Sequence, residues 1–72
     1  MVKAVILVKS PKKPLQQKLG KMDFVYNSFP VSGQFDAVAF VDVKDLSEIR
    51  EITTKIQMIP GVERTETMIE IQ

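Results

Sequence analysis

Two short, wholly apolar segments most strongly constrain what this chain can fold into. Residues 4–8 and 37–41 are apolar without alternation and are rich in β-branched side chains. A strand covered on both faces has this pattern, whereas a strand with one solvated face alternates apolar and polar residues. We therefore expect the strands over residues 2–9 and 35–43 to occupy the centre of a sheet.

Two further strand candidates have the features of sheet edges. Residues 24–31 are rich in aromatic and β-branched side chains but include Pro30, which has no N–H to donate to a neighbouring strand. Residues 62–71 combine β-branched residues with four charged ones, which suits an edge better than a centre. Gly33 is expected to supply the positive φ of a tight turn between residues 24–31 and the next strand.

Two helices are expected between the strands. The clearer one spans residues 45–58, where Asp45 and Glu48 form the aspartate version of a capping box. Its apolar residues recur at steps of three and four: Leu46, Ile49, Ile52, Ile56 and Ile59. The other helix is short and begins near Lys13 or Pro14, because proline is tolerated only in a first helical turn.

The order β-α-β-β-α-β, with the first and third strands inside, predicts an α+β domain of the ferredoxin-like type. The expected antiparallel sheet has the strand order 4-1-3-2, and both helices cover one of its faces. The other face of the central strands then exposes several apolar side chains, which marks an interface. We expect a single domain over residues 1–72 whose open sheet face packs against a second copy of the same sheet or against another partner.

The composition excludes several kinds of chemistry. The 72 residues contain no cysteine and no histidine, which removes disulfides, the usual zinc sites, thiol redox chemistry and imidazole-assisted catalysis. We therefore expect no catalytic residue, no metal site and no cofactor. A domain of this size has a thin stability margin, and self-association is the remaining way to increase it.

Charge and hydropathy indicate neither a nucleic acid nor a membrane as a partner. The formal net charge is +1, too small for electrostatic attraction to nucleic acid by itself. Residues 1–33 carry six basic and one acidic side chains, whereas residues 34–72 carry four basic and eight acidic ones. These halves complement each other within a domain or between subunits. The longest apolar run has five residues, and a cytoplasmic location is expected.

One segment, residues 31–36, gathers groups that suit a small ligand. Amide N–H groups around Gly33 can receive a carboxylate and Asp36 can receive an ammonium group, as binding of a free amino acid requires. A structural interpretation is simpler: Gly33 makes the turn, and Asp36 accepts hydrogen bonds from turn amides. The residues alone favour this structural interpretation, and Thr67 is likewise typical of an ordinary strand.

Two motifs resemble a known family. The stretch V-S-G-Q-F-D-A-V-A-F-V-D-V, from Val31 to Val43, resembles the "V-T-G-x-Y/F-D" hairpin in the effector domain of the leucine- and asparagine-responsive (Lrp/AsnC) transcription regulators. The stretch I-P-G-V-E-R-T-E-T, from Ile59 to Thr67, is similar to the closing motif "I-P-G-V-x-x-T-x-T" of that domain. The resemblance covers nearly the whole chain and departs at residues 10–23, where the first helix is shorter than usual.

The resemblance implies a regulatory module and not an enzyme. In the family this domain, called RAM, dimerises through its sheet face, assembles into higher oligomers and binds an effector, usually an amino acid, between subunits. Carried over position by position, it implies ligand contacts at Ser32, Gly33, Gln34, Phe35 and Asp36, with Thr67 from the closing strand. Full-length regulators also carry an N-terminal helix-turn-helix domain, and by this resemblance we expect a stand-alone RAM domain without one. A domain of this kind is expected to modulate transcription without binding DNA itself, including by mixed assembly with full-length Lrp/AsnC regulators.

Two alternative functions fit the same fold. A small dimeric α/β-barrel enzyme of the monooxygenase or isomerase type also pairs such sheets, and an enclosed pocket lined by Tyr26 and a carboxylate would favour it. A purely structural assembly subunit would keep the sheet interface and leave the hairpin without a ligand.

Overall fold

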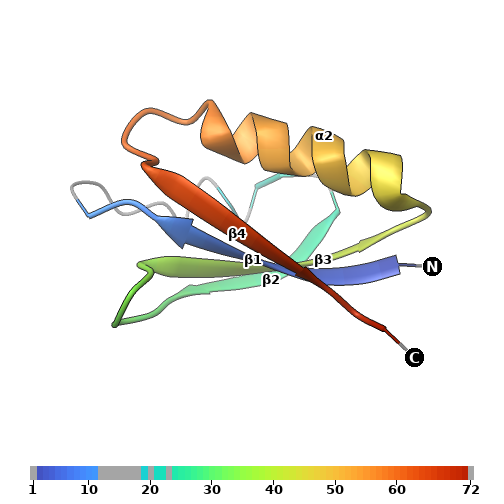
Figure 1. Cartoon of the computed structure of the whole chain (residues 1–72), viewed down its shortest axis with the longest axis horizontal. Coiled ribbons are helices and arrows are strands. Elements are labelled where there is room, and N and C mark those ends of the chain that lie inside the picture. The colour runs from blue at the N-terminus through green and yellow to red at the C-terminus, as the bar shows by residue number, and fades with distance from the viewer. Residues whose placement is uncertain (1, 12–18, 20, 23, 72) are drawn as a thin grey trace.

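Four strands and one helix make up the described part of the chain, which in this computed structural model comprises residues 2–11, 19, 21–22 and 24–71 (Figure 1). The elements are β1 (Val2–Lys9), β2 (Val25–Pro30), β3 (Ala37–Val43), α2 (Leu46–Gln57) and β4 (Arg64–Ile69). The strands form one antiparallel sheet in the order β2-β3-β1-β4. The predicted ferredoxin-like α+β fold, with the first and third strands inside and the proline-containing and charged strands at the edges, is confirmed.

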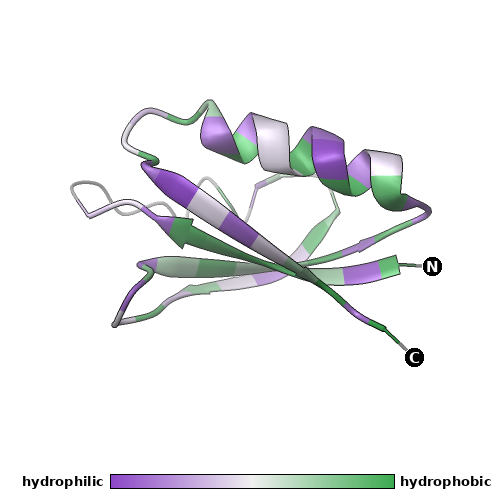
Figure 2. Ribbon diagram, viewed as in Figure 1, coloured by the Kyte–Doolittle hydropathy of each residue, from purple (hydrophilic) through white to green (hydrophobic). Residues whose placement is uncertain are grey.

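The two central strands bury one row of side chains and leave most of the other row half-covered. β1 and β3 pair along the whole of β3, from Val2 opposite Val43 to Val8 opposite Ala37. On β1, the side chain of Ile6 is buried, while its neighbour Leu7 points to the opposite face and is half-buried. In Figure 2 most of β1 and β3 is green, the colour of apolar residues. The unbroken runs therefore belong to a sheet that α2 covers on one face.

The helix α2 begins where the capping pattern predicted. Asp45 Oδ1 accepts hydrogen bonds from the backbone N–H of Ser47 (3.0 Å) and of Glu48 (3.3 Å). In return, Glu48 Oε2 accepts from the backbone N–H of Lys44 at 3.3 Å, one residue earlier than in the usual capping box. Orphan amides at the start of the helix are thus satisfied, and the entry of the chain from β3 is fixed.

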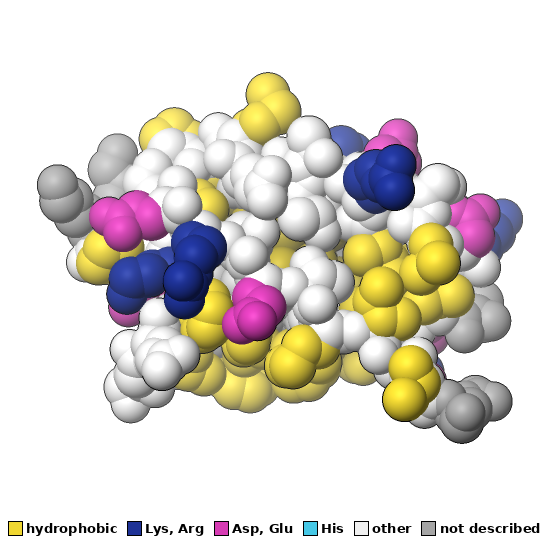
Figure 3. Space-filling view, in the orientation of Figure 1, with side chains coloured by type: hydrophobic (Ala, Val, Ile, Leu, Met, Phe, Trp, Pro, Cys, Tyr) yellow, Lys and Arg dark blue, Asp and Glu magenta, His cyan; other side chains and the backbone are white. Residues whose placement is uncertain are grey.

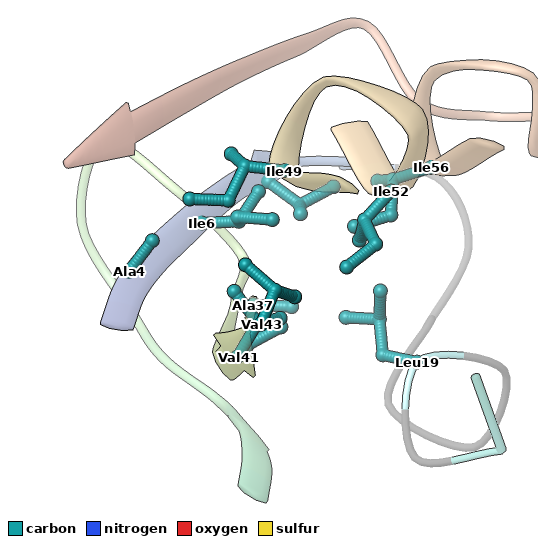
Figure 4. Close-up of a cluster of buried hydrophobic side chains, with 11 residues drawn as sticks. Ala4, Ile6, Leu19, Ala37, Val41, Val43, Ile49, Ile52 and Ile56 are labelled. Atoms are coloured by element: carbon teal, nitrogen blue, oxygen red, sulfur yellow. The ribbon is translucent and has the colours of Figure 1, made fainter. Parts of the chain in front are cut away.

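The apolar stripe of α2 packs on the sheet as expected, except at its first residue. Ile49, Ile52 and Ile56 are buried and lie over the inner side chains of β1 and β3 (Figure 4). Leu46 remains 58% exposed, although the periodicity placed it on the same face. It borders a surface groove together with Ile69 of the edge strand β4, where no further layer among the described residues covers it.

The predicted first helix falls mostly outside the described residues. Of its apolar positions, Leu19 is fully buried and Met22 packs against the same core. A hydrogen bond from the backbone N–H of Met22 to the carbonyl of Leu19 spans 3.2 Å. This segment therefore contributes to the core on the side of the sheet that α2 covers.

Candidate functional site

The predicted hairpin lies at the end of the sheet where β1 ends and β4 begins (Figure 1). Its loop is closed by a 3.0 Å hydrogen bond from the backbone N–H of Val31 to the carbonyl of Asp36. Gly33 has a φ of +122°, in the region that side chains rarely adopt, so the predicted role of this glycine in the turn is confirmed. Apart from Gly33 and its two neighbours in the chain, no described atom lies within 4 Å of the position that a Cβ at Gly33 would occupy, which leaves its backbone open to a ligand.

Asp36 ties the hairpin to the end of β1. Its Oδ2 accepts a hydrogen bond from the backbone N–H of Ser10 at 2.8 Å, and its own N–H donates to the carbonyl of Val8 at 2.9 Å. Hydrogen bonds to a charged acceptor are among the stronger ones in proteins. One carboxylate oxygen of Asp36 therefore orders the loop, but the donor is an amide at the end of β1, whereas the structural interpretation expected amides of the turn itself.

Two cationic side chains meet the hairpin from the neighbouring strands. The guanidinium of Arg64 lies over the ring of Phe35, 5.1 Å from its centroid, and Phe35 itself is only 8% exposed. Lys9 Nζ donates to the carbonyl of Gln34 at 3.3 Å. A shallow depression of about 430 Å³ opens between these groups and is lined by Lys9, Gln34, Glu63 and Arg64. We refer to it below as the corner depression.

Thr67 lies apart from the other predicted contacts within one chain. It stands opposite Ile6 near the middle of β1, and its hydroxyl oxygen is 3.4 Å from that of Thr53 on α2. Its side chain thus faces the helix, whereas the corner depression lies at the end of the sheet. The structure brings together the hairpin residues, and a ligand contact at Thr67 stays a prediction.

The sequence reasoning missed the charged residues that border the hairpin, Lys9, Glu63 and Arg64. The signal was present but incomplete: in the predicted order, the first and fourth strands are neighbours, so their ends must meet. Lys9 and Arg64 are in fact direct partners in the ladder. This register depends on the length of the connection through α2, which motif spacing alone does not define.

The face of the sheet away from α2 carries an apolar surface. It comprises Val5 and Leu7 of β1, Phe40 of β3, Tyr26 and Phe29 of β2, and Met68 of β4. Val38 of β3, the cross-strand partner of Leu7 and Phe29, is on the same face but is only 4% exposed. The rings of Tyr26 and Phe29 lie 6.2 Å and 5.8 Å from that of Phe40. In Figure 3 apolar side chains gather along the lower side of the molecule, below the sheet. We call this surface the open face.

The chain matches a family model over residues 3–72, and that family is described as the Lrp/AsnC ligand binding domain. The chain belongs to this family. The resemblance seen in the hairpin and closing motifs is thereby confirmed, and the Lrp/AsnC ligand-binding domain is a regulatory module of transcription regulators. No curated protein sequence matched the chain.

Solved structures agree with the membership in the Lrp/AsnC family. A protein of Thermus thermophilus is 30% identical, with a TM-score of 0.92 over 100% of this chain and 95% of that one. AsnC of E. coli is 20% identical, with a TM-score of 0.81 over 99% of this chain and 51% of that one. The regulator NMB0573 of Neisseria meningitidis, solved with L-Met, is 16% identical, with a TM-score of 0.81 over 99% of this chain and 50% of that one. The last two share the fold, and this Lrp/AsnC domain spans about half of each.

Among the described residues of this Lrp/AsnC domain, we find no second group of polar and charged side chains that resembles the hairpin site. Tyr26 borders a depression of about 290 Å³ that also touches Glu70, but it lies on the open face, and Tyr26 is 61% exposed. It is not the enclosed pocket that an α/β-barrel enzyme would need. Within the described ranges, no cluster of carboxylates is arranged to hold a metal ion, and no helix is long and apolar enough to cross a membrane.

Proposed function

We propose that this Lrp/AsnC domain is a sensing and oligomerisation module: it binds an amino acid and modulates transcription regulation without contacting DNA itself. The observation that carries the proposal is the match to the ligand-binding domain over residues 3–72, combined with a polar hairpin that borders an apolar sheet face. This arrangement supports a small-molecule site in the hairpin and, beside it, an apolar surface suited to subunit pairing.

The ligand proposal rests on the chemistry of the hairpin. The NMB0573 protein, which has the same fold, was solved as a complex with L-Met. In the present chain, Ser32, Gly33 and Gln34 are exposed at the turn, and Asp36 uses one carboxylate oxygen, Oδ2, to bind Ser10. A free amino acid needs donors for its carboxylate and acceptors for its ammonium group, and this loop presents both kinds of group.

The assembly proposal rests on the open face. Exposed apolar surfaces bordered by charged residues are typical of subunit interfaces, and Tyr26, Phe29 and Met68 are among the exposed large apolar side chains of this domain. We propose that two copies pair through this face and that the dimers assemble further. The same face would allow mixed assembly with full-length Lrp/AsnC regulators.

Thermal unfolding at one fixed protein concentration, with each of the twenty amino acids and with size exclusion on the same samples, tests the proposal. A ligand present at about 100 times its dissociation constant adds about 2.7 kcal/mol to the free energy of unfolding, which raises the midpoint by several degrees. We expect one or two amino acids to do so and the protein to elute as an oligomer.

Two variants locate the response. Asp36→Asn removes the charge of Asp36 and keeps an oxygen that accepts the Ser10 amide, so it should fold and lose the response to the ligand. Glu51→Gln removes an exposed charge on α2 and should respond like the wild type. A flat panel from a stable oligomer would reject the sensing proposal and favour a structural subunit, and a strictly monomeric protein at micromolar concentration would reject the assembly proposal.

A further inference from the structure

The corner depression is lined by two positively charged side chains and one negatively charged side chain. Lys9 and Arg64 are direct cross-strand partners of β1 and β4, and in this register both side chains lie on the same face of the sheet. Like charges that face each other across a strand pair destabilise the sheet. Glu63, the third charged residue of the depression, is exposed at its margin. Figure 3 shows Lys and Arg side chains gathered at this end of the molecule, with acidic side chains beside them.

Each of the two cations contacts a neutral partner. The Arg64 guanidinium lies over the ring of Phe35 (5.1 Å), and Lys9 Nζ donates to the carbonyl of Gln34 (3.3 Å). Both contacts hold the cation in place and leave its charge uncompensated. Bound anions would relieve the repulsion between these two side chains and gain charge-assisted hydrogen bonds.

The base of the depression is tied together by backbone hydrogen bonds. The N–H of Glu63 donates to the carbonyl of Lys9 at 2.8 Å, which joins the start of β4 to the end of β1. The N–H of Asp36 donates to the carbonyl of Val8 at 2.9 Å, which joins the hairpin to the same strand. The backbone segments that carry the three charged groups therefore have fixed spacing, so that binding of a ligand orders side chains and not the backbone.

On this basis, and resting on the proposed function, we propose that the corner depression selects an acidic amino acid, aspartate or glutamate. Such a ligand carries two carboxylates and one ammonium group. The carboxylates complement the two cations Lys9 and Arg64, and Glu63 adds to Asp36 of the adjoining hairpin a second acceptor for the ammonium group. A neutral amino acid has one carboxylate and leaves one of the two cations without a partner. Selectivity thus comes from matching charges, and the shape of the depression has a smaller role.

Isothermal titration calorimetry with L-glutamate, L-aspartate, L-glutamine and L-asparagine tests the selectivity. Each amide is nearly the same size as its acid and lacks only the side-chain charge. We expect the better acid to bind about tenfold or more tightly than its amide, the factor that one lost charge-assisted hydrogen bond provides. The preference should shrink as salt is added, because salt screens exposed charges.

Three variants assign the charges, and a fourth serves as control. Lys9→Gln and Arg64→Gln should each weaken binding of the acid by about tenfold and bring its affinity close to that of the amide. Glu63→Gln should reduce the preference of the protein for L-glutamate over glutarate, which lacks the ammonium group. Lys3→Gln is the matched control, because Lys3 lies on the same strand and the same face at the opposite end of the sheet, and it should bind like the wild type.

The outcomes separate this inference from the proposed function. If a neutral amino acid binds more tightly than both acids, or if Lys9→Gln and Arg64→Gln bind the acid like the wild type, the inference is wrong while amino acid sensing stands. If none of the twenty amino acids binds, both are wrong.

Discussion

Both faces of the sheet carry apolar side chains, but these side chains differ in how far they are buried. Ile6 and Leu7 are neighbours on β1, yet Ile6 is fully buried beneath α2, and Leu7 is half-buried on the open face. Within the described residues, the helix α2 covers one face. The apolar residues on the other face form a surface that one copy leaves unprotected, and burial of that surface is the contribution that assembly can make to a domain of this size.

Truncating the adjacent residues Ile6 and Leu7 of β1 tests most directly whether the two faces differ in this way. Ile6→Ala should lower the free energy of unfolding by about 3 to 4 kcal/mol, because it leaves a cavity in a fully packed core. Leu7→Ala should cost about 1 kcal/mol in dilute protein, since its side chain is already partly in water. Urea unfolding at two protein concentrations measures both. If the open face is an interface, the cost of Leu7→Ala grows with concentration, whereas that of Ile6→Ala does not.

A charge on the open face should separate subunits without unfolding them. Phe40→Glu places a carboxylate among the rings of Tyr26 and Phe29, where burial against a second copy would be costly. We expect a folded monomer by sedimentation velocity and circular dichroism. The control is Met58→Glu, which adds the same charge at a residue that is 77% exposed and lies after α2. An unchanged oligomer in Phe40→Glu would show that assembly uses another surface.

The hairpin beside the open face should tolerate changes of side chain better than changes of backbone. Gly33→Ala should lower the free energy of unfolding by about 1 to 2 kcal/mol, because its φ of +122° is unfavourable for any residue with a Cβ. There is room for the added atom, so the cost is conformational. Ser32→Ala, next to it and exposed, should change stability by less than about 0.5 kcal/mol. Equal stability of the two variants by urea unfolding would contradict this account of the turn.

The smallest effect is expected at the helix cap, and it depends on pH. Hydrogen bonds from the Ser47 hydroxyl and then from the Glu48 amide hold the pKa of Asp45 below its ordinary value of 3.8. A carboxyl group with a lowered pKa in the folded state stabilises the protein above its unfolded pKa, and this contribution is lost as the pH falls through the folded pKa. Asp45→Asn, which keeps a good N-cap, should therefore lose less stability than the wild type on acidification below about pH 4.

This last comparison also separates the two faces. Asp45 belongs to the helix that covers one face, so the variant should assemble like the wild type at neutral pH. Parallel thermal unfolding of the two proteins between neutral and acidic pH checks the expected difference. An identical pH dependence would mean that other carboxylates account for the acid sensitivity.

Much of the fold followed from local patterns. The boundaries of β1 matched the prediction, the Asp45 cap formed, and Pro30 lies at the end of an edge strand. These features depend on neighbours in sequence or on how many faces of a strand are covered. The first appears as a local motif, and the second appears in the pattern of apolar residues along the strand. Leu46 shows the limit of such reasoning, because its position in the stripe indicated burial and the edge of the sheet left it exposed.

The candidate site was predictable in part. Motif and turn chemistry located the hairpin and Gly33, since a positive φ is a local requirement. Thr67 was added because of its motif, yet its side chain faces Thr53 on the helix side of the sheet. Arg64, which does reach the hairpin, is separated from Phe35 by 28 intervening residues, and no local pattern joins such distant positions.

Short stretches of residues were therefore enough to predict strand order, the helix cap and the turn. Each of them depends on backbone preference or on the pattern of apolar and polar residues over a few positions. The corner depression depended on folding: the ladder register places Lys9 opposite Arg64 and brings Arg64 over Phe35. That register is set by how far α2 carries the chain before it returns as β4. It is a property of packing across the whole domain, and it decides which charges a ligand meets.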